Sequence, residues 1–119
     1  MLDIDFRKSD NLDIRIITLS GEFDLFEKER VLNLLPKVLE GGRGGVLIDL
    51  SGVSLLDSAG VEVLIRYYVE LEKAGIRFVV VASDNNYLTK KFRKLGIFDN
   101  TGLELYETFE EAEKSFRSR

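Results

Sequence analysis

The chain opens with two short segments in which apolar and polar residues alternate. Residues 2–7 read LDIDFR, a period of two that is typical of a half-buried strand. A second run, residues 12–19, follows directly after the turn-forming residues at 9–11. Two strands joined by so short a turn predict an antiparallel hairpin. We therefore expect a sheet that begins with this hairpin.

Buried strands and amphipathic helices alternate after the hairpin. Residues 46–50 and 76–82 are nearly continuous apolar runs, as expected of central parallel strands covered on both faces. Helical spacing of apolar residues predicts helices after Asp24, after Ser58, after residues 83–86 and after Thr108, with a short strand at 103–106 before the last. The order ββαβαβαβα favours one layered α/β domain over residues 1–119, with a mixed, mainly parallel sheet.

Several residues set expectations for the helix boundaries. Asp24 is a predicted N-cap, and Glu27 would complete a motif close to a capping box. Pro36 predicts a kink, or a short first helix with a restart near it, because proline forfeits a helical hydrogen bond. Thr108 and Glu111 have the spacing of a second capping box. The residues 41–45, GGRGG, end the first helix; they lack the lysine and hydroxyl of a phosphate-binding loop.

Helical periodicity also predicts which side chains face the core. After Ser58 the expected core face consists of Val61, Leu64, Ile65, Tyr68 and Leu71. A second stripe at spacing four contains Ala59, Val63 and Tyr67; it either flanks the core or extends an exposed docking surface. In the helix after residues 83–86, the inward residues are Leu88, Phe92 and Leu95 and the outward ones are Lys90, Lys91, Arg93 and Lys94.

Polar residues gather where function is expected in a parallel α/β sheet, at the carboxyl ends of strands. Residues 20–24, 51–54, 57–60 and 83–86 occupy such positions. Ser58 stands immediately before the strongest helix, which makes it a predicted N-cap that contributes about 1 kcal/mol. A helix N-terminus also tolerates a phosphate, through its dipole and free amides. Ser58 is therefore either a structural cap or a phosphorylation site.

The acidic residues at these strand ends have several interpretations. Asp24 and Asp57 are either caps and solvated loop acids or contacts to a kinase and its magnesium. Asp49 lies within an apolar strand, so we expect its carboxylate to reach the strand end or to accept backbone hydrogen bonds. A magnesium site formed by Asp24, Asp49 and Asp57 is a further alternative.

Composition excludes several classes of function. The 17 basic and 21 acidic residues give a net charge of −4. The chain therefore lacks the excess of positive charge that is typical of a nucleic-acid binder. The chain has no Cys and no His, so thiol nucleophiles, zinc sites and histidine-based triads are excluded. We see no signal peptide and no apolar run approaching the ~20 residues of a membrane helix. We expect a cytoplasmic protein that is not an enzyme and has no membrane or nucleic-acid partner.

Two motifs together resemble a known family. Residues 49–53, DLSGV, followed by residues 56–61, LDSAGV, are similar to the signature of the STAS-domain anti-sigma factor antagonists of bacteria. Residues 19–24, LSGEFD, resemble the exit of that family's second strand. Length and element order agree over nearly the whole chain. Many relatives have a second serine where this chain has Ala59, which leaves Ser58 as the sole hydroxyl in the Asp-Ser motif.

The resemblance implies a regulatory switch. The unphosphorylated protein would bind an anti-sigma factor that is also a serine kinase, and so release a sigma factor. The kinase would phosphorylate Ser58 and reverse binding, and a metal-dependent, PP2C-type serine phosphatase would restore it. The nucleotide and Mg²⁺ belong to the kinase, so this chain needs no cofactor. Expected partner contacts are Gly21, Glu22, Asp24, Asp57, Ala59, Gly60, Val63, Tyr67 and Ser83.

Three alternatives compete with this interpretation. A non-phosphorylated STAS accessory subunit of a lipid-transport or stress-sensing complex would keep the fold and change the role. A two-component receiver domain would need an acidic pair after the first strand and a helix there, whereas this chain opens with a hairpin. A small phosphoesterase would show magnesium-dependent turnover abolished by Asp57→Ala.

Overall fold

A computed structural model describes residues 1–41, 44–83, 90, 91, 94, 96 and 102–117 of the chain. Its strands are β1 (Leu2–Lys8), β2 (Arg15–Phe23), β3 (Val46–Leu56), β4 (Phe78–Val81) and β5 (Glu104–Tyr106). Its helices are the 3₁₀ turn η1 (Leu25–Glu27), α1 (Lys28–Leu32), α2 (Leu35–Gly41), α3 (Ser58–Lys73) and α6 (Phe109–Arg117). Most of the helix expected after residues 83–86, including its inward residues Leu88, Phe92 and Leu95, lies outside the described residues.

The five strands form one sheet in the order β1-β2-β3-β4-β5. β1 and β2 pair antiparallel from Leu2 opposite Gly21 to Lys8 opposite Arg15, which confirms the predicted hairpin. The pairs β2–β3, β3–β4 and β4–β5 are all parallel. The fold is therefore the expected mixed, mainly parallel α/β domain, and the carboxyl ends of β2 and β3 lie at the same edge of the sheet.

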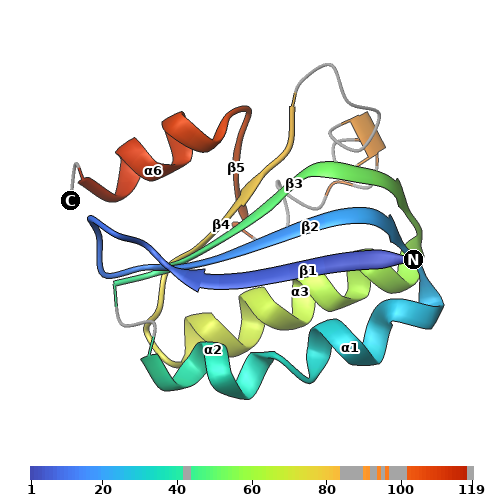
Figure 1. Cartoon of the computed structure of the whole chain (residues 1–119), viewed down its shortest axis with the longest axis horizontal. Coiled ribbons are helices and arrows are strands. Elements are labelled where there is room, and N and C mark those ends of the chain that lie inside the picture. The colour runs from blue at the N-terminus through green and yellow to red at the C-terminus, as the bar shows by residue number, and fades with distance from the viewer. Residues whose placement is uncertain (42–43, 84–89, 92–93, 95, 97–101, 118–119) are drawn as a thin grey trace.

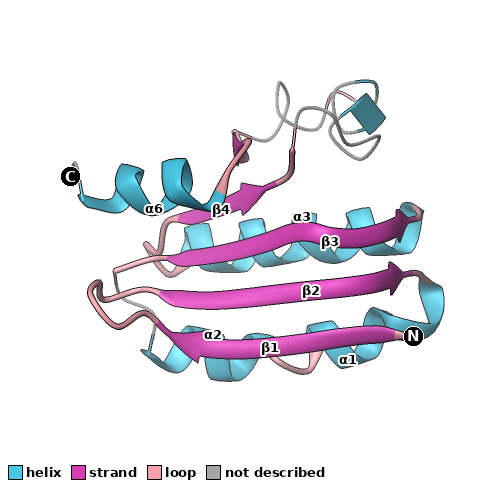
Figure 2. Ribbon diagram, turned by 45° about the horizontal axis from the view of Figure 1, so that its top comes forward, coloured by secondary structure: helices cyan, strands magenta, loops and turns pink. Residues whose placement is uncertain are grey.

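Helices cover the two faces of the sheet unequally. α1 and α2 follow one another in one row, with α3 beside them, against one face of the sheet, and α6 lies against the other (Figure 1). Turning the molecule shows β1, β2 and β3 running along the helices beneath them, with α6 beside β4 (Figure 2). The larger core contains Ile17, Leu19, Phe23, Ile48, Leu50, Leu64, Tyr67 and Leu71, among others. The smaller core joins α6 to the sheet through Ile14, Ile16, Leu47, Val79, Val81 and Ala112.

Two strands are longer than their apolar runs predict. β2 continues through Ser20 and Gly21 to Phe23, and β3 continues through residues 51–54 to Leu56. The expected loop at 51–54 is therefore wrong. The two extensions pair with each other, with two irregularities in register. Backbone hydrogen bonding between β2 and β3 therefore continues into a region where most side chains are polar and exposed. The longer strands carry the chain directly to the start of α3.

The first helical segment is broken, as Pro36 predicts. α1 ends at Leu32 and α2 restarts at Leu35, which places Pro36 in the first turn of α2, where a missing N–H is tolerated. Asp24 is an N-cap, with its carboxylate accepting from the Phe26 N–H at 3.1 Å. Glu27 does not complete a capping box. It is buried and accepts from Arg30 at 2.5 Å and from the Leu2 N–H at 3.3 Å instead.

The last helix begins as expected. The Thr108 hydroxyl accepts from the Glu111 N–H at 3.1 Å and donates to the Glu111 carboxylate at 3.0 Å. This is the hydroxyl half of a capping box, and it fixes the first turn of α6.

Candidate functional site

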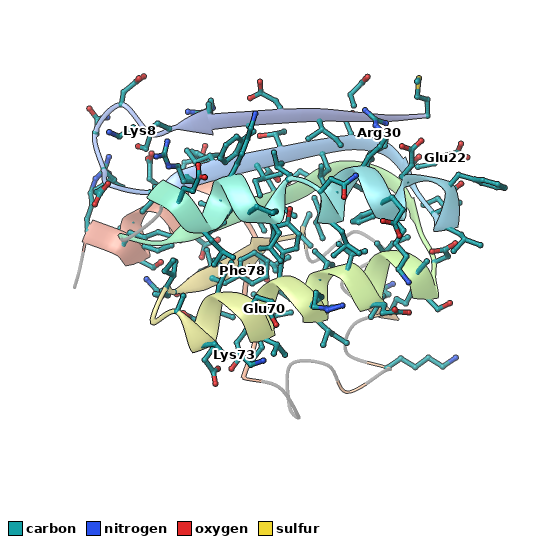
Figure 3. All side chains as sticks on the ribbon, turned by 90° about the horizontal axis from the view of Figure 1, so that it is seen from below. Lys8, Glu22, Arg30, Glu70, Lys73 and Phe78 are labelled. Carbon is teal, nitrogen blue, oxygen red and sulfur yellow. The ribbon has the colours of Figure 1, made fainter. Side chains whose placement is uncertain are left out.

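The carboxyl ends of β2 and β3 meet the first turn of α3. Glu22 pairs with Leu55 and Phe23 with Leu56, and the Asp57 N–H donates to the Phe23 carbonyl at 3.4 Å. Two of the polar segments expected at this edge, residues 20–24 and 57–60, therefore lie together. Figure 3 shows Glu22 at the end of the molecule where α3 begins, with Lys73 at the opposite end of that helix. This shared edge is the candidate site.

Asp57, not Ser58, caps α3. One carboxylate oxygen accepts from the N–H groups of Ala59 at 2.9 Å and Gly60 at 3.1 Å, and the other accepts from Leu25 at 3.2 Å. The prediction that Ser58 is the N-cap is wrong. A carboxylate has two oxygens with about four acceptor positions, so Asp57 accepts from all three amides at once, whereas a hydroxyl oxygen has only two lone pairs.

Ser58 is consequently the first residue of α3 and is exposed to solvent. The first amides of α3, those of Ala59 and Gly60, are not free, because both already bond to Asp57. A phosphate on Ser58 would add its negative charge beside the Asp57 carboxylate. The site thus presents an accessible hydroxyl whose removal leaves the helix cap in place.

Gly60 allows the close approach of β2 to α3. A Cβ atom on Gly60 would lie 2.9 Å from the Phe23 carbonyl oxygen and 2.5 Å from a methyl carbon of Leu56. Ala59 and Gly60 are both buried beneath the first turn. Their observed contribution is to pack the start of α3 against the sheet edge, with Ser58 directed outwards.

The β2–η1 segment provides the acidic part of the site. Gly21 has a φ of +108°, and a Cβ there would clash with the Met1 carbonyl, so glycine is required beside β1. The Glu22 side chain is 57% exposed. Asp24 is half-buried and holds η1 through its cap. The structure therefore leaves Glu22 accessible at the edge and gives Asp24 a structural role.

The second stripe expected on α3, which contains Ala59, Val63 and Tyr67, does not form an exposed surface. Val63 and Tyr67 are fully buried, so the prediction that they extend a docking surface is wrong. The Tyr67 hydroxyl donates to the Val31 carbonyl at 2.5 Å, and burial raises the pKa of the Tyr67 phenol. Ile65 and Tyr68, expected in the core, are only half-buried. α3 is rotated from the expected orientation because α1 packs along it.

The segment after β4 reaches this edge through one residue that sequence reasoning missed. Lys91, expected to point outward, is half-buried, and its ammonium donates to the Leu56 carbonyl. A lysine on a polar helical face carries no signal for such a contact. Ser83 follows β4 and is half-buried, whereas residues 84–86 lie outside the described residues.

The metal interpretation of the acidic residues gains no support. Asp49 accepts from the Ser51 N–H at 2.9 Å, so its carboxylate bonds to backbone as expected. Across the part of the chain that the structure describes, acidic side chains nowhere form a group of three suited to a metal ion. Asp24 and Asp57 each bond to backbone amides instead.

The chain belongs to the STAS domain family, whose model matches residues 3–112. Comparison with curated proteins finds no match. In the ranges described above, no helix is long and apolar enough to cross a membrane.

Solved structures share the fold. An anti-sigma factor antagonist from Mycobacterium paratuberculosis is 24% identical with a TM-score of 0.85, covering 98% of this chain and 95% of its own. SpoIIAA, an anti-sigma factor antagonist in unphosphorylated form, is 21% identical with a TM-score of 0.76, covering 98% and 100%. The phosphorylated form of the Bacillus cell fate determinant SpoIIAA is 22% identical with a TM-score of 0.72, covering 98% and 100%.

Proposed function

We propose that this protein is an anti-sigma factor antagonist controlled by phosphorylation of Ser58. In its unphosphorylated form it binds an anti-sigma factor that is also a serine kinase, and a sigma factor is released. Family membership and likeness to proteins described as anti-sigma factor antagonists support the general role. The existence of SpoIIAA in a phosphorylated and an unphosphorylated form supports a phosphate-dependent cycle.

The observation that carries the proposal is the position of Ser58. It is exposed at the first turn of α3, while Asp57 supplies the cap. A kinase can therefore reach the hydroxyl without unfolding the helix, and the phosphate acts on the surface that a partner contacts. A serine hydroxyl that capped α3 would be bonded to a backbone amide and less accessible to a kinase.

Charge accounts for the reversal of binding. A phosphoserine carries roughly −1.5 to −2 charges. It would stand next to Asp57, at an edge that also carries Glu22. One pair of unit charges at about 4 Å is worth about 4 kcal/mol at an effective dielectric of about 20. If the kinase holds its nucleotide phosphates against Ser58, repulsion of that size weakens binding about a thousandfold.

Within this proposal the chain is a substrate and a ligand, not an enzyme. It has no His and no Cys, so the usual general base and thiol nucleophile are missing from the whole sequence. The nucleotide and Mg²⁺ are those of the kinase, and a PP2C-type serine phosphatase removes the phosphate. The cycle takes place in the cytoplasm and involves neither nucleic acid nor membrane as a direct partner of this chain.

The test is intact-mass and phosphopeptide analysis of the protein after incubation with ATP and phosphatase inhibitors in lysate of the organism that makes it. The proposal expects one phosphoryl group on Ser58 and none on a Ser58→Ala variant. Ser54→Ala, which removes another exposed serine near the same edge, is the matched control and should be labelled normally. No labelling under any growth condition would favour the non-phosphorylated accessory subunit.

A further inference from the structure

Exposed large apolar side chains are concentrated near Ser58. In the described ranges, such side chains are found at Met1, Leu25, Phe26, Leu55 and Val69. Phe26 is 88% exposed and Leu25 is 63% exposed, and the two are adjacent in η1. We call this pair the apolar turn. Single exposed apolar residues are ordinary, but two neighbours on one ordered turn form a feature that a partner could bury.

Three hydrogen bonds hold the apolar turn in place. The Leu25 N–H donates to Asp57 at 3.2 Å, the Phe26 N–H donates to Asp24 at 3.1 Å, and the Glu27 N–H donates to the Asp24 carbonyl at 3.0 Å. An anchor that is ordered before binding loses little conformational entropy when it is buried. Because Asp57 also caps α3, the same carboxylate fixes both the apolar turn and the first turn that carries Ser58.

The surroundings of the apolar turn are acidic. Carboxylates of Glu22, Asp24, Asp57 and Glu62 lie on the segments that flank it. Lys28 is the cation on the next turn, and it pairs with Glu62 at 2.9 Å. Lys91 donates to the Leu56 carbonyl. The Met1 ammonium lies 3.7 Å from the Glu22 carboxylate and is a third cation. Four carboxylates against three ammonium groups leave one net negative charge, which disfavours an anionic lipid surface and matches a protein surface with a basic rim.

We infer that Phe26 is the anchor residue by which this protein docks to its kinase, filling an apolar pocket whose rim carries lysine or arginine side chains. The inference rests on the proposed function, since it assigns the apolar turn to the kinase that modifies Ser58. It adds a residue outside the Asp-Ser motif that determines partner affinity. Aromatic residues dominate such anchors because they bury a large area at a small cost in side-chain entropy.

The experiment measures initial rates of Ser58 phosphorylation as the concentration of added protein is varied in that lysate, with radiolabelled ATP. Phe26→Ala should raise KM about 30-fold and leave kcat within about twofold of wild type. Val69→Ala is the matched control, since Val69 is 38% exposed but lies about three turns along α3 from Ser58. It should leave both constants unchanged. Thermal unfolding of both variants should match wild type.

The attraction between the acidic surroundings of the apolar turn and the basic rim of the kinase is tested separately, by the dependence of KM on salt. The wild-type KM should rise with added salt, and Glu22→Gln should flatten that dependence. If Ser58 is labelled but Phe26→Ala has the wild-type KM, the inference fails and the proposed function stands. If wild-type Ser58 is never labelled, both fail. If the wild type sediments as a dimer and Phe26→Ala as a monomer, the apolar turn binds a second copy of the chain and the kinase assignment is overturned.

Discussion

The Tyr67 hydroxyl donates a hydrogen bond to the Val31 carbonyl at 2.5 Å, and this bond joins the middle of α3 to the end of α1. α1 is a helix of five residues, and the Val31 carbonyl in its last turn also accepts from the Leu34 N–H at 3.2 Å. Tyr67 adds a further donor to that carbonyl from across the core. The short, interrupted first helix is thus stabilised by a side chain on its neighbour.

Tyr67→Phe should lower the free energy of unfolding by about 1 kcal/mol, because it removes one buried hydrogen bond and keeps the aromatic packing. Denaturant unfolding measures this loss. Ser58 phosphorylation should proceed at the wild-type rate, since Tyr67 is fully buried. A slower rate at unchanged stability would show instead that Tyr67 contributes to docking.

The cap at the start of α3 can be assigned by a pair of substitutions. Asp57→Ala should lower the free energy of unfolding by about 2 kcal/mol, because it removes the cap of α3 and the bond to Leu25 together. Ser58→Ala should change it by less than about 0.5 kcal/mol, as expected of an exposed residue without a capping role. Equal losses in the two variants would contradict the assignment of the cap to Asp57.

Ser58→Asp should weaken binding to the anti-sigma kinase at least about tenfold, because it places a negative charge against the nucleotide phosphates of the kinase. Asparagine has nearly the same size as aspartate but carries no charge, so Ser58→Asn should retain most of the wild-type affinity. Titration calorimetry with the purified kinase compares the two variants. Similar affinities for both would mean that steric fit, not charge, decides release.

The buried carboxylate of Glu27 predicts an acid-sensitive contact. The hydrogen bond from Arg30 holds the pKa of Glu27 below its ordinary value of 4.5, and the Leu2 N–H acts in the same direction. A group whose pKa is lowered by folding stabilises the protein above its unfolded pKa, and this stability is lost as the pH falls through the folded pKa. The wild type should therefore lose stability as the pH falls from about 4.5.

Glu27→Gln removes that titrating group. The difference in stability between this variant and the wild type should therefore change most below about pH 4.5. Melting temperatures between about pH 7 and about pH 3 provide the comparison. Glu29→Gln, which removes an exposed carboxylate two residues further along in α1, controls for the change in net charge. A constant difference between Glu27→Gln and wild type across this range would show that the ionised carboxylate adds nothing.

Local patterns predict the architecture well and the site less completely. The hairpin, the alternating order, the Asp24 cap and the restart of the helix near Pro36 follow from side-chain period, turn residues and proline geometry. The sequence pattern predicts the cap of α3 one residue too late, because Asp57 and Ser58 are both good N-caps. Only the backbone conformation distinguishes them, and it depends on how β3 delivers the chain to α3.

Other details depend on neighbours distant in sequence. Residues 51–54 form a strand because β2 continues beside them. Tyr67 is buried and Tyr68 half-buried because α1 packs along α3; a rotation of about 100° per residue exchanges such neighbours. The Lys91 contact joins two residues that are 35 positions apart in the sequence. None of these relationships is encoded in the spacing of residues within one element.

The double use of the Asp57 carboxylate bears on how long a phosphorylated state would last. A phosphate bonded to the backbone amides of a helix N-terminus would be partly shielded from a phosphatase. At the start of α3 those amides already have a partner, so the phosphate on Ser58 would remain on the solvent side. The phosphatase would then determine how long Ser58 stays phosphorylated, and the fold itself would not prolong that state.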